Sequence, residues 1–173
     1  IFSERDVSEA IELRGTLEGL SARLAAERGV APALLAGARE CLNLIDDVLG
    51  QPALDDGAFS SYVSLNERFH AVLASMADSH TVARELERVT SLPFASPSGF
   101  VVRQANSPQA RDMLVVAQDQ HWQVLDAIAA REGARAEAIM REHSRIAQRN
   151  LREALQSRQL DQMPGVRLIR ARA

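Results

Sequence analysis

Hydrophobic positions along the chain recur every three or four residues over long stretches, which is the spacing of one face of an α-helix. Alternation with a period of two, which would indicate a half-buried strand, is nowhere sustained long enough to predict one. The pattern therefore predicts an all-α protein. Its clearest stripe, between residues 55 and 77, consists of Phe59, Tyr62, Val63, Phe69, Leu73 and Met76.

The predicted helices are separated by short segments rich in Gly, Pro, Ser and Asp, which end or begin helices. Ser107-Pro108 predicts one helix start, with Ser at the N-cap and Pro in the first turn. The helices span about residues 7–28, 32–49, 55–77, 80–91, 107–131 and 134–157. In the first of them, the stripe that we expect to face the core is Leu13, Leu17, Leu20 and Leu24.

Residues 92–100 interrupt the helical pattern, because two prolines and a glycine stand among their apolar residues. The segment is too apolar for an ordinary exposed loop, so we expect Phe94 and Phe100 to wall a pocket or to pack in the core. The tail after Asp161 has the features of a frayed end. The pattern thus predicts one folded domain over residues 1–160 and a tail over 161–173.

Four polar side chains lie inside the apolar stripes, namely Asn66, His70, His121 and His143. Asn66 and His70 are four residues apart and project from one face of a helix, where each needs a polar partner if buried. Antiparallel neighbours can bring three mid-helix histidines to one level, as in the metal sites of helix bundles. The alternative is that each histidine is an ordinary core residue, and His80, at a helix start, is expected to be a surface or cap residue.

Three neutral imidazoles and an amide oxygen suit a borderline divalent ion, zinc or nickel. Such a site has no anionic protein ligand, so the ion would keep its double positive charge. A carboxylate from a small molecule would complete it well. The residue types therefore make the same four positions candidates for a metal centre that binds an anion.

Composition narrows the class of protein. The chain has 173 residues, of which 46% are hydrophobic and 4% aromatic, enough for one domain with a sizeable core. A net charge of −3 gives no basic face of the kind that binds nucleic acid. The single cysteine, Cys41, excludes a disulfide within the chain and is expected to pack in the core. No apolar run is long enough for a membrane span and no signal peptide is visible, so we expect a cytoplasmic protein with no membrane partner.

Four sequence elements, in this order, together resemble the FCD domain, the C-terminal effector-binding domain of FadR-type GntR transcription regulators. They are Glu12-Leu13-Arg14-Gly15-Thr16-Leu17-Glu18 with the following Ala22–Arg28, then Asn66-x-x-Phe69-His70-x-x-Leu73, Gln120-His121, and Met140-x-x-His143. The resemblance covers the chain from about Ala10 to Leu155. It implies an antiparallel bundle of six or seven helices around a central pocket for a metal and a ligand.

The resemblance also implies a ligand set. Many members hold a divalent metal with an Asp and three His, which helps to bind a small organic acid. Carried over by position, the ligands here are Asn66, His70, His121 and His143. Asn66 departs from the typical Asp, since it offers a carbonyl oxygen and no charge.

Three further residues are candidates for binding the effector. The resemblance places Arg14 at the pocket, where a guanidinium can bind a carboxylate through two hydrogen bonds. The alternative is a surface arginine paired with Glu18, four residues on. Asn150 lies seven residues after His143, hence on the same face, and Gln118 lies one turn before His121. Each of these two amides either bonds the ligand or has no special role.

The expected function is the sensory half of a bacterial repressor or activator. A winged helix-turn-helix domain would precede Ile1 and contact the DNA, and the resemblance implies a homodimer. A second class remains open, because a three-histidine metal with open positions can activate water or a thiol. Against such an enzyme, Glu67 and Glu142 adjoin the ligands but point off the stripe, so no general base is evident. A third class is a metal-free helical interaction module.

Overall fold

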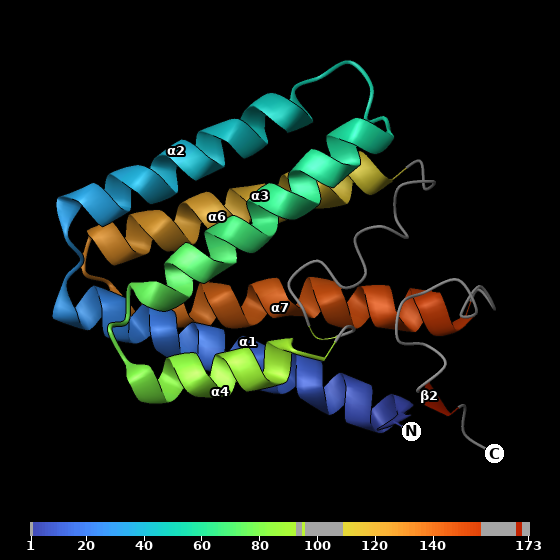
Figure 1. The fold of residues 1–173 in the computed structure, drawn as a ribbon, viewed down its shortest axis with the longest axis horizontal. Helices are drawn as coiled ribbons and strands as arrows, with labels where there is room; N and C mark the ends of the chain where they lie inside the picture. The colour runs from blue at the N-terminus through green and yellow to red at the C-terminus, as the bar shows by residue number, and fades with distance from the viewer. Residues whose placement is uncertain (1, 93–94, 96–108, 157–168, 171–173) are drawn as a thin grey trace.

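The protein is a bundle of α-helices (Figure 1). The computed structural model describes residues 2–92, 95, 109–156 and 169–170. No helix in these ranges is both long enough and apolar enough to cross a membrane. The all-α prediction is confirmed, and the described helices are α1 (Glu4–Arg28), α2 (Pro32–Leu49), α3 (Asp56–Ser75), α4 (His80–Thr90), α6 (Ala110–Ala129) and α7 (Gly133–Gln156).

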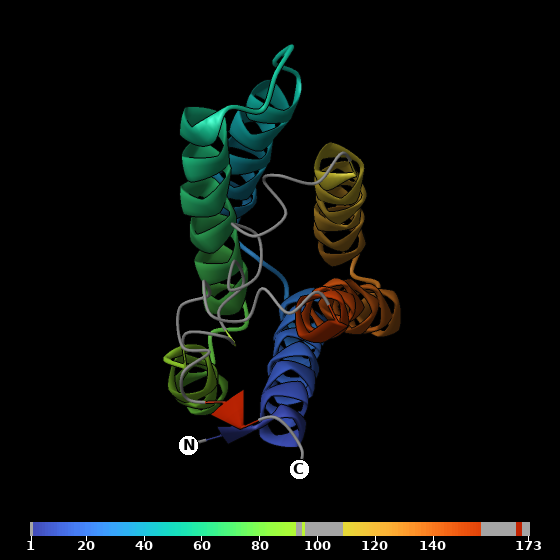
Figure 2. The same cartoon turned by 90° about the vertical axis from the view of Figure 1, so that its right-hand side faces the viewer.

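Helix α1 is the central element of the bundle. It packs along α7 and also contacts α3, α4 and α6, while α2 lies against α3 and α6. In both views, α2 and α3 lie together on one side and α1 with α7 on the other (Figures 1 and 2). The main core fills the space between these pairs, and a smaller cluster lies at the amino-terminal end of α1, made by Val7, Ile11, Val89, Ala95 and Leu151.

The helix boundaries follow from their caps. The Ser3 side chain accepts a hydrogen bond from the Asp6 backbone N–H, and the Asp6 carboxylate accepts one from the Ser3 backbone N–H, which starts α1 with a capping box. Asp55 caps α3. The predicted start of the fifth helix at Ser107-Pro108 is wrong, because α6 begins at Ala110 without a side-chain cap. Ser107 and Pro108 themselves lie outside the described residues.

The four leucines of α1 do not form its core face, so that prediction is wrong. Leu13 is 51% exposed, and the other three are only partly buried. The buried face carries Val7 and Ile11 near the start of the helix, and small and charged residues further on, where α1 and α7 approach closely. A Cβ at Gly15 would overlap the Ser144 side chain, and a Cβ at Gly19 would lie 2.9 Å from the Arg141 Cγ. Leucines at these positions would hold the two helices apart.

A two-residue parallel pair joins the two ends of the chain. Phe2 and Ser3 form β1, which pairs with Ile169 and Arg170 of β2. Two residues are too few to show a strand periodicity, and the prediction of a frayed tail is wrong for these two tail residues. Of the interrupting segment, Ala95 is described and fully buried, whereas Phe94 and Phe100 lie outside the described residues.

Candidate metal centre

Three histidines from three helices meet in the interior of the bundle. His70 comes from α3, His121 from α6 and His143 from α7, and one ring nitrogen of each lies within 4.8 Å of the others. The ring centroids of His70 are 5.4 Å from those of His121 and His143, which are 4.7 Å apart. His121 is fully buried, His70 is 6% exposed, and His143 is partly buried. The predicted convergence of the three histidines is therefore confirmed.

Each of these rings has an oxygen acceptor at Nδ1. His70 Nδ1 lies 2.7 Å from Glu18 Oε2, His121 Nδ1 lies 3.0 Å from Gln118 Oε1, and His143 Nδ1 lies 2.8 Å from Gln120 Oε1. The Nε2 atoms of His70 and His121 are buried and have no hydrogen-bond partner within the described part of the chain. Metal-binding histidines have this arrangement, with one nitrogen donating to an outer oxygen and the other on the ion.

The buried surroundings favour neutral rings. Burial lowers the pKa of His121 well below its ordinary value, and the neighbouring His143 and His70 lower it further. Burial likewise lowers the pKa of His143, to about 3, and the charge of His70 acts in the same direction. Phe69 adds an apolar wall, with its ring centroid 4.7 Å from that of His121. His121 and His143 are therefore neutral near pH 7, as metal ligands must be.

Glu18 links the histidines to a buried arginine. Its Oε1 lies 3.0 Å from Arg14 Nε, and Arg14 also donates through a terminal nitrogen to the Ala95 carbonyl, at 3.1 Å. Burial alone would raise the pKa of Glu18, but the charge and hydrogen bond of His70, together with Arg14, lower it to about 2. The Arg14–Glu18 pair is present, as one alternative predicted, but Arg14 is only 3% exposed and is not a surface residue.

The other predicted site residues are all buried. Asn66 lies one turn before His70 on α3 and is 3% exposed. Gln118 lies behind His121 and donates from its amide nitrogen to the Leu42 carbonyl and to Asp46. Asn150, 7% exposed, lies two turns after His143 on α7. The geometry thus connects Arg14 to His70 through its ion pair with Glu18, and Gln118 to His121 through a hydrogen bond. It places Asn66 and Asn150 on the helices that carry His70 and His143.

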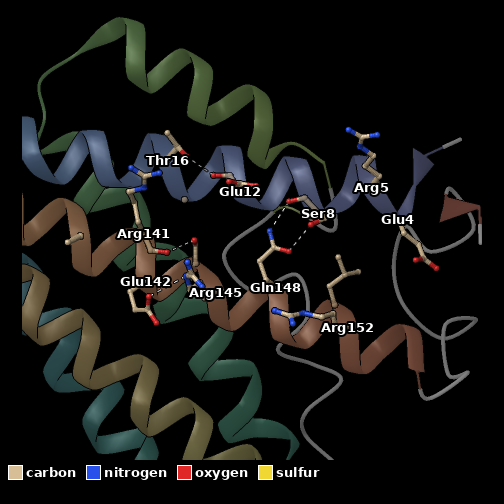
Figure 3. A pocket seen from close by; sticks show the side chains of 14 residues that line it. Glu4, Arg5, Ser8, Glu12, Thr16, Arg141, Glu142, Arg145, Gln148 and Arg152 are labelled. Carbon is tan, nitrogen blue, oxygen red and sulfur yellow. Dashed lines mark hydrogen bonds and ion pairs between the residues drawn. The ribbon is translucent and has the colours of Figure 1, made fainter.

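A separate groove runs between α1 and α7 (Figure 3). It has a volume of about 810 Å³, and its lining includes Arg141, Arg145 and Arg152 along α7. The Glu142 carboxylate lies in this groove, 3.4 Å from Arg145. None of the three histidines lines the groove, and neither do Arg14, Gln118 and Asn150. The groove is therefore distinct from the candidate metal centre.

Three residues of the site were missed by sequence reasoning. The sequence predicts Glu18 only as a partner of Arg14, Gln120 only as part of the motif Gln120-His121, and no role for Asp46. Gln120 adjoins His121 in sequence but contacts His143 on the next helix, and Asp46 contacts Gln118 across 72 residues. Neither link follows a fixed spacing. Glu18 had one available clue, since it lies on the same helix face as Arg14.

The chain was also compared with known proteins. A family model described as the FCD domain matches residues 9–145, a range that includes all three histidines, Arg14 and Asn66. No curated protein matches the chain. Because the matched range covers well over half of the sequence and agrees with the all-helical fold, the chain belongs to the FCD domain family, the C-terminal effector-binding domain of GntR/FadR-type regulators.

Proposed function

We propose that this domain binds a divalent metal ion, zinc or nickel, through His70, His121 and His143, with Asn66 as a fourth ligand. The observation that carries the proposal is that all three rings are bonded outward through Nδ1, and that the buried Nε2 atoms of His70 and His121 have no hydrogen-bond partner among the described residues. Nitrogens that share a tetrahedral zinc at about 2.0–2.1 Å lie roughly 3.3 Å apart. The ligand nitrogens lie within 4.8 Å of one another, so small side-chain rotations would close the site.

The charges of the site favour an anionic effector. The three imidazoles and the Asn66 amide bring no negative charge, and Arg14 and Glu18 neutralise each other. The ion would therefore keep its double positive charge inside a buried region, where an uncompensated charge is costly. We infer that the effector is a small organic acid whose carboxylate completes the coordination of the metal, with Arg14, Gln118 and Asn150 nearby.

The experiment is calorimetric titration of small carboxylic acids into the zinc-loaded protein, with bound metal measured in parallel. The panel contains a hydroxy acid, a dicarboxylate, a sugar acid and an aromatic acid. Arg14→Ala should weaken acid binding about ten- to a hundredfold, because a hydrogen bond to a charged group contributes about 1.5–3 kcal/mol. Arg5→Ala, at an exposed position of the same helix, is the control. If no acid binds the zinc-loaded parent, the organic-acid proposal is wrong.

Control of DNA binding would work through a shift between two arrangements of the protein. FCD domains act as sensors in regulators whose N-terminal domain binds DNA. An effector shifts such an equilibrium only as far as its affinities for the two states differ. We propose that metal and acid together stabilise one arrangement of the bundle and thereby change the geometry of the attached DNA-binding domains.

We further propose that the domain forms a homodimer through the outward leucine face of α1, defined by Leu13, Leu17, Leu20 and Leu24. Their spacing of four, three and four residues is the seam of a coiled coil. At one edge of this face the charges are paired within the chain, Glu9 with Arg5 and Arg23 with both Glu27 and Glu137 of α7.

Sedimentation of the purified domain tests this surface. We expect the parent to have about twice the chain mass of 18.9 kDa. Leu13→Glu should shift the equilibrium toward the monomer, because it places a charge within the apolar seam. Val116→Glu, at a 53% exposed position on α6, should leave the mass unchanged. A Leu13→Glu variant that stays dimeric at the same concentration would rule out this surface.

A further inference from the structure

Gln118 is held in a single orientation by helix α2. Its amide nitrogen donates to the Leu42 carbonyl at 2.9 Å and to the Asp46 carboxylate at 2.8 Å. Both partners are acceptors, so the flipped amide would point its oxygen at two other oxygens. The amide group therefore faces α2, and its oxygen faces His121.

This orientation decides where the proton of His121 lies. Gln118 Oε1 is 3.0 Å from His121 Nδ1 and can only accept, so Nδ1 must carry the hydrogen. A neutral imidazole has one N–H, and a charged ring is costly at a fully buried position such as that of His121. Its Nε2 atom is therefore left with an unprotonated lone pair, in a buried position without a hydrogen-bond partner among the described residues.

Asp46 is fixed from both sides. Its Oδ1 accepts from Gln118, and its Oδ2 accepts from the indole of Trp122 at 3.0 Å. Gln118 and Trp122 lie one turn apart on α6 and on either side of His121 in sequence. The carboxylate on α2 thus contacts the α6 segment that carries the histidine at two points.

We propose that Asp46 and Gln118 act as a clamp that keeps the proton of His121 on Nδ1 and so presents Nε2 to the metal ion. Asp46 and Gln118 are positioning residues in this assignment, because they act through His121. The role of this tautomer in metal binding rests on the proposed metal site. The position of the proton itself does not depend on bound metal. It also means that α2, which supplies none of the candidate ligands, is connected to the site.

Nitrogen NMR of the histidine rings in metal-free protein at pH 7 tests the clamp directly. His121, assigned by its loss in His121→Gln, should show a single tautomer with the proton on Nδ1. Gln118→Met, which keeps the length of the side chain but removes the amide, should lose this single-tautomer signature. A parent protein with the proton on Nε2, or with both tautomers equally populated, would overturn the clamp.

Zinc affinity, measured by competition with a chromophoric chelator, gives the second readout. Gln118→Met should bind zinc about ten- to a hundredfold more weakly, the usual cost of losing an outer partner of a metal-binding histidine. Asp46→Ala should weaken binding by less than Gln118→Met does, since the Leu42 carbonyl still holds the amide. Asp47→Ala, at the adjacent exposed position, is the matched control and should bind as the parent does.

These outcomes separate the two proposals. Equal zinc affinity in the parent, Gln118→Met and Asp46→Ala would overturn the clamp even if the metal site is real. A parent that shows the Nδ1 tautomer but binds neither zinc nor nickel would support the clamp and refute the proposed metal site. If Gln118→Met does not fold, Asp46→Ala, altered at an exposed position, still provides both readouts.

Discussion

The Nδ1 atom of His70 on α3 lies 2.7 Å from one oxygen of Glu18 on α1, and the other oxygen of that carboxylate lies 3.0 Å from Arg14. A single carboxylate therefore orients a candidate metal ligand and balances a buried cation. Glu18 contacts His70, whereas the Nδ1 atoms of His121 and His143 face the amide oxygens of Gln118 and Gln120. Removal of Glu18 is expected to affect both folding and metal binding.

The first prediction concerns Glu18→Gln. The amide oxygen can still accept from His70, but Arg14 loses its carboxylate in a buried position. Breaking a buried ion pair from one side costs about 3–5 kcal/mol, and we expect the free energy of unfolding of the metal-free protein to fall by that amount. Zinc affinity should fall about tenfold or more, because the outer partner loses its charge.

Urea denaturation and chelator competition measure these two effects. Glu12→Gln provides the control, since Glu12 is an exposed residue of the same helix. It should change the unfolding free energy by no more than about 0.5 kcal/mol. A Glu18→Gln protein as stable as its parent would show that the Arg14–Glu18 pair makes no net contribution to folding.

The second prediction is the pH dependence of stability without metal. His121 and His143 have lowered pKa values in the folded protein, near 3 for His143, against 6.5 in the unfolded chain. As the pH falls below 6.5, the unfolded chain binds protons first, so the folded state loses stability. Each histidine contributes a loss of about 1.4 kcal/mol per pH unit within this window. Glu18, with a pKa of about 2 against 4.5, adds a further loss only below pH 4.5.

Denaturation with urea between pH 7 and 5, in the presence of a chelator, tests whether the free energy of unfolding falls as the pH falls. His143→Gln should have a shallower pH dependence than the parent, by about the contribution of one histidine. His80→Gln, altered at an exposed helix start, should have the slope of the parent. A parent stability that stays constant or rises as the pH falls through this range would contradict the prediction.

The third prediction concerns Asn66→Asp. If Asn66 is the fourth ligand, the aspartate adds an anionic oxygen and compensates one positive charge of the metal. Zinc affinity should then rise and affinity for the organic acid should fall, which isothermal titration of each ligand measures. An unchanged affinity for both would place Asn66 outside the coordination sphere. Asn43→Asp, at an exposed position on α2, controls for the added charge.

The fourth prediction concerns the contact between α1 and α7. Gly15→Ala forces a Cβ into the Ser144 side chain and should cost about 1–3 kcal/mol of stability. Adding Ser144→Gly should recover part of the loss, because it removes the overlapping atoms. Gly37→Ala on α2 is the matched control, since nothing lies within 4 Å of its added Cβ. Thermal denaturation should show Gly37→Ala more stable than the parent, by about 0.5–1 kcal/mol.

The parts of the site that sequence could predict are those with a helical period. His70, His121 and His143 each interrupt an apolar stripe, and three such interruptions were enough to predict their convergence. The stripe of α3 is almost entirely buried, as expected. The fold class followed from the same periodicity. These predictions succeeded for one reason. In these helices, the position of a residue in the helical period was enough to predict whether it faces the core.

The failures arise where burial depends on a neighbouring helix. In α1 the four leucines are exposed or only partly buried, and the side that packs against α7 carries Gly15, Gly19 and the Arg14–Glu18 pair. By hydrophobicity alone, the glycines and the charged pair would be assigned to the solvent-facing side of the helix. Their burial follows from close helix approach and from polar partners on other helices, neither of which a single sequence displays. The same holds for Gln118, whose orientation is fixed by Leu42 and Asp46 of α2.

Because α1 is long, a tilt at its contact with His70 would displace its amino-terminal end. The helix is continuous from Glu4 to Arg28, and Glu18 touches His70 from its middle. Fourteen residues separate Glu18 from the first turn, a rigid arm of about 21 Å at 1.5 Å per residue. A tilt of about 5° around Glu18 would move the Glu4 end by roughly 2 Å, for an arm of this length. A change in the angle of α1 at Glu18 would therefore move the far end of the helix by much more than it moves the part next to His70.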